Sequence, residues 1–152
     1  MGASIVLFFP LKELAIAEVL LNDETVVPKQ RKVLLKSGKL SIKELLIGKR
    51  NEIYQDHIAS VVLHIGRELF SLLPIDRTII NAKSNLLNAS TGKLELQTIL
   101  SVELFRDTMN ILNFDKIDPS DCMKNFKCNM NFRKSQGMFP VESLYTINAI
   151  KE

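Results

Sequence analysis

NEIYQDHIASVVLHIGRELFSLLP, residues 51–74, gives the clearest structural signal in the chain. Its apolar side chains recur at steps of three and four residues, which places them on one wide stripe of a helix. Pro74 ends the pattern, because the residue before a proline is pushed out of the α region. We therefore predict a long helix over residues 51–73 that forms the spine of the core.

A regular strand pattern follows this helix. Residues 94–105 alternate between two sets of side chains over twelve positions, a period that a strand with one core face explains. The intervening sequence from Asn88 to Gly92 has the residue types of a turn. Residues 77–88 are therefore the expected partner strand of a hairpin.

The remaining segments are shorter and their patterns are weaker. We predict a buried strand over residues 4–9, a helix over residues 11–21 and a short helix over residues 107–112. Asp118 followed by Pro119 is typical of a helix start, since aspartate caps the first turn and proline fits inside it.

The C-terminal part is expected to be extended over residues 126–134 and 138–145, divided by a turn. Together, these elements indicate an α+β fold in which a long helix packs on a small, mainly antiparallel sheet with short capping helices. We expect residues 1–152 to form a single domain, and we keep open that the chain is a fragment of a longer protein.

Composition narrows the possible settings. The chain has 152 residues, 46% of them hydrophobic, and a protein of this size buries about 70% of its unfolded surface. Its two cysteines cannot form a disulfide framework, which favours a reduced, cytoplasmic setting. No signal-peptide pattern opens the chain, and its uncharged runs are far shorter than the ~18 residues of a membrane helix. We therefore expect no membrane partner.

Positive charge is concentrated between residues 29 and 50. This segment has eight basic residues and one acidic residue, a net charge of +7, whereas the whole chain carries +3. A concentrated positive field attracts polyanions and is typical of a nucleic-acid interface. The basic residues, which we take as candidate nucleic-acid-binding residues, are Lys29, Arg31, Lys32, Lys36, Lys39, Lys43, Lys49 and Arg50.

The central part of this segment is predicted to be a hairpin. Two apolar runs flank Ser37-Gly38-Lys39, which has turn chemistry, and we expect Lys32, Lys36, Lys39 and Lys43 to project from one solvated surface. Residues 29–50 contain no aromatic side chain, so single-stranded bases have no stacking platform there. Duplex DNA or an acidic protein fits better as a partner. The alternative is that the lysines only protect an exposed strand edge.

Metal binding and catalysis have weak support. His57, His64 and Glu68 share one helical stripe, but the two histidines are separated by about 10.5 Å along the axis, too far for one ion. His64 and Glu68 remain weak candidates, with a strand carboxylate such as Glu95 or Glu103 as a third ligand. No nucleophile elbow and no phosphate-binding glycine loop is present. We therefore assign no catalytic residue and no cofactor.

The order of several turn and cap motifs resembles that of a known family. The chain is similar, over residues 26–130, to a segment upstream of the nuclease core in bacterial proteins with Mrr-type restriction endonuclease domains, and to uncharacterised bacterial proteins. The resemblance rests on Val27-Pro28-Lys29, Tyr54-x-Asp56, Glu68-Leu69-Phe70, Asn88-x-x-Thr91-Gly92, Ile99-Leu100-Ser101-Val102, Leu112-Asn113-Phe114 and Ile117-Asp118-Pro119-x-Asp121-Cys122-Met123-Lys124-Asn125-Phe126. It implies an accessory role beside DNA-cleaving machinery and carries no active residue onto this chain.

Three hypotheses follow. The first is a non-catalytic accessory domain of a bacterial restriction- or defence-related protein, with a basic hairpin that binds nucleic-acid backbones. The second is a protein-interaction or homo-oligomerisation module that uses exposed apolar residues of the hairpins or of the Phe8–Phe9 end. The third is a small metal-dependent enzyme centred on His64 and Glu68.

Overall fold

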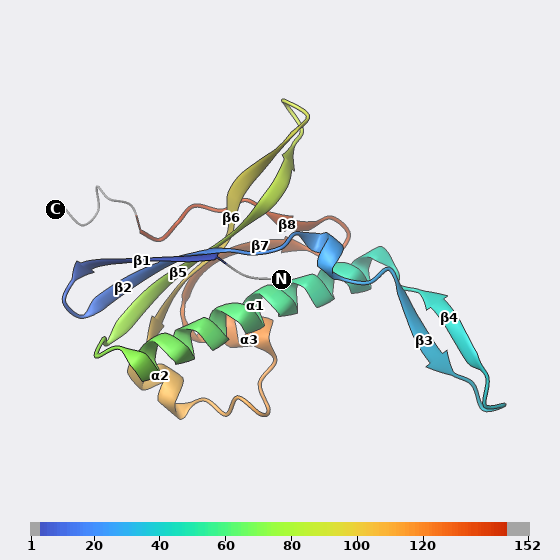
Figure 1. Cartoon of the computed structure of the whole chain (residues 1–152), viewed down its shortest axis with the longest axis horizontal. Coiled ribbons are helices and arrows are strands. Elements are labelled where there is room, and N and C mark those ends of the chain that lie inside the picture. Colours follow the sequence, from blue (N-terminus) through green and yellow to red (C-terminus); the bar gives the residue numbers. More distant parts are fainter. Residues whose placement is uncertain (1–3, 146–152) are drawn as a thin grey trace.

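A computed structural model of the protein describes residues 4–145 (Figure 1). One long helix crosses a large sheet, and a separate two-stranded hairpin projects from one end. In chain order the elements are β1 (Ser4–Leu11), β2 (Leu14–Leu20), η1 (Glu24–Val26), β3 (Gln30–Leu34), β4 (Leu40–Glu44), α1 (Ile47–Leu72), β5 (Arg77–Asn88), β6 (Lys93–Phe105), α2 (Arg106–Ile111), α3 (Pro119–Cys122), η2 (Met123–Asn125), β7 (Lys127–Arg133) and β8 (Gly137–Phe139).

The main sheet has six strands in the order β1-β2-β5-β6-β7-β8. β2 and β5 pair in parallel, and the other neighbours pair antiparallel. The expected fold, a long helix on a small sheet, is therefore wrong, whereas one long helix beside a sheet is consistent with the expected α+β class. The sheet is large and mixed, and strands hold 42% of residues 4–145 against 30% for helices. The parallel pair arises because the chain from β2 crosses the sheet through α1 before it returns as β5.

The helix predicted over residues 11–21 is also wrong, because this segment forms β2. Leu14, Ala15, Ile16 and Ala17 are all buried, with exposed fractions of 2% or less. A helix on a core would bury only one stripe, whereas a strand between two neighbours and covered on both faces buries every position. The three- and four-residue spacing in this run was therefore a coincidence of a continuous apolar stretch.

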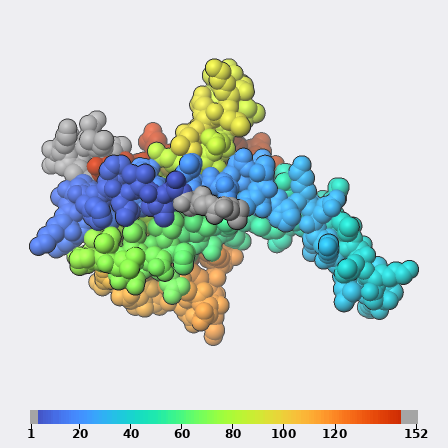
Figure 2. Space-filling view, in the orientation of Figure 1, coloured from blue at the N-terminus to red at the C-terminus, as the bar shows by residue number. Residues whose placement is uncertain are grey.

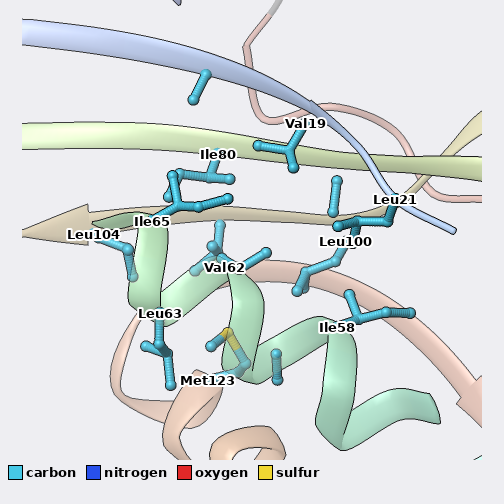
Figure 3. Packing of buried hydrophobic residues seen from close by; sticks show 14 of the residues in the cluster. Val19, Leu21, Ile58, Val62, Leu63, Ile65, Ile80, Leu100, Leu104 and Met123 are labelled. Atoms are coloured by element: carbon cyan, nitrogen blue, oxygen red, sulfur yellow. The ribbon is translucent and has the colours of Figure 1, made fainter. Parts of the chain in front are cut away.

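The predicted long helix is confirmed as α1, which begins at Ile47, four residues earlier than expected. Its side chains Ile58, Val62 and Ile65 point towards the sheet, where they meet residues of β2, β5 and β6 (Figure 3). Leu63 and Met123 lie on the other side of the helix (Figure 3). α1 is thus packed between the sheet and the α2–η2 segment, which explains why its apolar stripe is wide.

Gly66 marks the closest approach of α1 to the sheet. A Cβ atom at this position would lie 2.4 Å from Cδ1 of Leu104 in β6. Real Cβ atoms do not approach another heavy atom so closely, so a larger residue at this position would force the buried Leu104 side chain to shift.

The predicted β5–β6 hairpin is confirmed, and it extends beyond the body of the protein (Figure 1). The Asn88 side chain accepts a hydrogen bond from the Ser90 amide at 2.9 Å, and Gly92 adopts a left-handed φ of 70°. The predicted helix start is also confirmed, because the Asp118 side chain accepts a hydrogen bond from the Asp121 amide at 3.1 Å.

A polar cluster joins the C-terminal segment, residues 140–145, to the second face of the sheet, which is the face opposite α1. The oxygen of the fully buried Asn81 side chain accepts hydrogen bonds from Ser101 at 2.5 Å and from Ser143 at 2.9 Å. Ser101 Oγ in turn accepts from the Leu144 amide at 2.9 Å. We expected a strand over residues 138–145. In the structure β8 is limited to Gly137–Phe139. Residues 140–145 cross this face of the sheet as an irregular segment.

β1 forms one edge of the sheet, as a strand but not as the buried one that we predicted. Its apolar side chains are exposed, with fractions from 38% at Leu7 to 55% at Phe9. α1 lies over the strands further into the sheet and leaves this edge open. Among residues 4–145, no helix combines the length and the apolar character needed to span a membrane.

Candidate nucleic-acid interface

The basic hairpin forms an arm, which we define as residues 29–45. Its strands β3 and β4 make a two-stranded sheet of their own, separate from the main sheet. A hydrogen bond of 2.8 Å from the Leu45 amide to the Lys29 carbonyl closes its base. The arm projects away from the body of the protein (Figures 1 and 2). It can therefore reach a large ligand that the body does not touch.

The tip of the arm is a tight turn between Leu35 and Lys39. The Leu35 amide donates to the Lys39 carbonyl at 2.8 Å, and the Gly38 amide donates to the Leu35 carbonyl at 2.9 Å. Gly38 has a φ of 83°, a left-handed conformation that favours glycine. The predicted turn is thus confirmed, and it places Lys36 and Lys39 at the tip.

The pairing of β3 with β4 sorts the arm residues onto two faces. Arg31 lies directly opposite Lys43 on one face, the basic face. Lys32 lies opposite Ile42, and Leu34 lies opposite Leu40, on the other face. Directly paired residues share a face, and neighbours along a strand alternate. The expectation that Lys32 and Lys43 share one surface is therefore wrong.

The cations of the arm are available to an external anion. All six of them are exposed: Lys29, Arg31, Lys32, Lys36, Lys39 and Lys43. Within residues 4–145, none of the six has a carboxylate oxygen within 4.0 Å. The acidic residue of the arm, Glu44, lies opposite Gln30 at the base. The carboxylates of residues 4–145 therefore leave this charge uncompensated.

The other two candidate residues, Lys49 and Arg50, belong to the first turn of α1. Lys49 lies 3.9 Å from the Glu52 carboxylate, and that carboxylate also binds Lys134 at 3.2 Å. Arg50 is half-buried, with its Nε atom enclosed and without a hydrogen-bond partner in the described part of the chain. These two side chains are thus less available than the arm cations.

The start of α1 adds partial positive charge next to the arm. α1 has no side-chain cap at Leu46 and no acidic residue in its first turn. The first amides of a helix carry partial positive charge. The base of the arm therefore runs directly into a helix end that favours a negative group.

The weak metal candidates do not converge on a third ligand. His64 and Glu68 are exposed on α1. Glu103 lies opposite Ile79 on the second sheet face, where it pairs with Arg77 at 3.8 Å, and Glu95 accepts a hydrogen bond from Asn88 on the distal part of the hairpin. Across residues 4–145, no three His, Cys, Asp or Glu side chains come together as a metal site.

The cysteines lie in apolar surroundings. Cys122 is buried and Cys128 is half-buried, and both thiols are free. Burial raises the pKa of the Cys128 thiol to about 11, and burial also raises the pKa of Cys122. Because the thiolate is the nucleophile, neither cysteine is activated for covalent chemistry at neutral pH.

The sequence analysis expected exposed apolar residues on the hairpins, but it did not identify which residues of the arm share an apolar face. Leu34, Leu40 and Ile42 are 70%, 67% and 63% exposed. Counting the register outward from the turn would have paired Leu34 with Leu40, but whether the main body covers them depends on the tertiary fold. Comparisons of this chain with protein-family models, with curated proteins and with solved structures find no match.

Proposed function

We propose that this protein is a non-catalytic accessory domain whose arm binds the backbone of duplex nucleic acid. The observation that carries the proposal is the group of six exposed arm cations without a carboxylate partner in residues 4–145. Lysine and arginine side chains bind phosphate oxygens without reading sequence. The resemblance to segments upstream of Mrr-type nuclease domains supports an accessory role in a bacterial restriction- or defence-related protein.

The geometry favours duplex over single-stranded ligands. The arm lacks aromatic residues on which unpaired bases stack. Its cations lie on the basic face, at the tip and beside the apolar face, and thus surround the hairpin. A ligand with phosphates on two sides, such as a duplex with its two strands, engages more of them than a single strand does.

A salt titration tests this proposal. A fluorescent duplex of about 20 base pairs is titrated with the protein at about 50 and about 200 mM salt, with anisotropy as the readout. About four phosphate contacts would weaken binding roughly 100-fold between the two conditions. Absence of binding at the lower salt concentration, or binding that salt does not weaken, would contradict the proposal.

Self-association through β1 is a second candidate function. β1 is an edge strand whose apolar side chains are exposed, and its eight residues include no charged side chain. Edge strands of monomeric proteins are usually protected from pairing by charges, proline or bulges. In β1, the protection is limited to Pro10 and the irregular register between Phe8 and Leu11, which leaves residues 4–8 regular. Light scattering at increasing concentration tests this candidate. A dimer that the substitution V6K disrupts supports it, and a monomer at all concentrations excludes it.

A further inference from the structure

The apolar face of the arm lacks a cover in the described part of the protein. Leu34 and Leu40 lie directly opposite each other next to the turn, and Ile42 follows on the same face. Among the strands of residues 4–145, β3 and β4 pair only with each other. Exposed apolar groups of this kind mark interaction sites, and an isolated two-stranded hairpin gains stability when something covers its face.

The charges near the apolar face of the arm indicate which kind of partner covers it. Lys32 lies on the same face, Lys36 and Lys39 lie at the tip, and Arg31 and Lys43 lie on the face behind. Glu44 shares the apolar face at its base, but the cations outnumber it, so the surroundings of the face are net positive and disfavour an uncharged apolar protein surface. Duplex DNA presents the complementary arrangement, because its outside is negative and its stacked bases are apolar. Charge complementarity therefore favours duplex DNA.

We propose that Leu34 and Leu40 act as a wedge that enters the minor groove and partly unstacks one base step. Lys36 and Lys39 then contact the phosphates beside the opened step, and the duplex bends. This inference rests on the proposed function and specifies its substrate as bendable duplex DNA. Leucine and isoleucine side chains insert in this way in minor-groove architectural proteins, where the lost stacking is offset by additional contacts.

The dimensions and the chemistry of the arm fit a wedge. Five-residue strands extend about 17 Å, so the tip can enter a groove while the body stays outside. The arm offers few groups that read base edges, since its uncharged polar side chains are Gln30 at the base, Ser41 on the basic face and Ser37 in the turn. Recognition would thus depend on how easily a base step opens and not on hydrogen bonds to base edges.

The test compares an intact duplex with the same duplex carrying a two-thymine bulge, in which stacking is already broken. The test variant is L34A/L40A. The matched control is L87A/L94A, which removes another directly paired leucine couple, 66% and 67% exposed, from the β5–β6 hairpin. The variant L34M/L40M keeps an apolar wedge and shows whether a change in the arm as such matters.

We expect the native protein, the control and L34M/L40M to bind the bulged duplex about tenfold more tightly than the intact one, because they need not unstack it. L34A/L40A should bind both within about twofold while keeping its salt dependence. Energy transfer between dyes at the two duplex ends should rise when the native protein binds, and should not rise with L34A/L40A.

The outcomes separate this inference from the proposed function. Salt-dependent binding without a preference for the bulge, or an equal preference in L34A/L40A, overturns the wedge and leaves backbone binding in place. Absence of binding to either duplex overturns both. Binding to phosphatidylserine vesicles that is lost in L34A/L40A, together with unbent DNA, also overturns the wedge and assigns the leucines to a membrane surface.

Discussion

Arg31 and Lys43 lie directly opposite each other on the basic face of the arm, and within residues 4–145 neither has a carboxylate within 4.0 Å. Like charges in this position repel, which destabilises the pairing of the two strands. Phosphate groups of a bound nucleic acid would remove the repulsion. The repulsion therefore lowers the stability of the free arm, and anion binding should raise it.

The substitution K43E tests this relationship. An acidic side chain opposite Arg31 replaces repulsion with attraction, worth about 0.2–1 kcal/mol for such a pair. Amide exchange across β3 and β4 should slow, while affinity for duplex DNA at low salt should fall at least tenfold. K12E makes the same charge change in the β1–β2 turn, remote from the arm (Figure 1). Equal loss of affinity in both variants would mean that only net charge matters.

The contact of Gly66 with Leu104 predicts a steric effect on stability. G66A should lower the free energy of unfolding by up to about 2 kcal/mol, because overpacking costs about 1–3 kcal/mol and the gain in helix propensity offsets about 1 kcal/mol of it. In an L104A background, the same change should no longer destabilise the protein. Urea denaturation of the four proteins measures the coupling. The same loss in both backgrounds would show that the contact is unimportant.

Arg106 predicts a second stability effect at the end of α1. Its guanidinium donates hydrogen bonds to the carbonyls of Phe70, Leu73 and Ile75 at 2.7, 2.7 and 2.8 Å. R106M leaves these carbonyls without this donor, and we expect a loss of about 2–4 kcal/mol in the free energy of unfolding. R67M is the control, because the Arg67 guanidinium is exposed over the Phe114 ring and should contribute at most about 1 kcal/mol.

The Cys128 thiol predicts a dependence on pH. Its pKa is about 11 in the folded protein, above the value of about 8.5 in an unfolded chain. The thiol's contribution to stability is therefore complete below about pH 8.5 and is lost as the pH rises towards 11. Alkylation of Cys128 by iodoacetamide at pH 8, followed by peptide mass spectrometry, should be much slower in the native protein than in urea. Equal rates would contradict a buried thiol.

The sequence predicts those elements of the fold whose hydrophobic pattern is local and extends over many residues. α1 repeats its apolar spacing over more than five turns, and β5–β6 combine strand alternation with a turn that contains Asn88 and Gly92. β2 could not be predicted in this way. Its burial on both faces depends on β5, whose Arg77 pairs with Leu14 from far along the chain.

The candidate site was predictable in its charge but not in its geometry. The turn around Gly38 and the excess of cations are local properties, and both are present in the structure. The faces depend on register, because a shift of one residue moves a side chain to the other side. The pairing of Lys32 with Ile42 therefore separated Lys32 from Lys43. The exposure of Leu34 depends on the position of the arm outside the body.

The most direct test of phosphate contact by the arm is the salt dependence of duplex binding in R31Q/K43Q. The matched control K12Q/K116Q removes the same charge from exposed lysines outside the arm. If the arm cations contact phosphates, the slope of log affinity against log salt should decrease by about 2 in R31Q/K43Q and by less than about 0.5 in the control. Equal slopes in the native protein and in R31Q/K43Q would contradict the account.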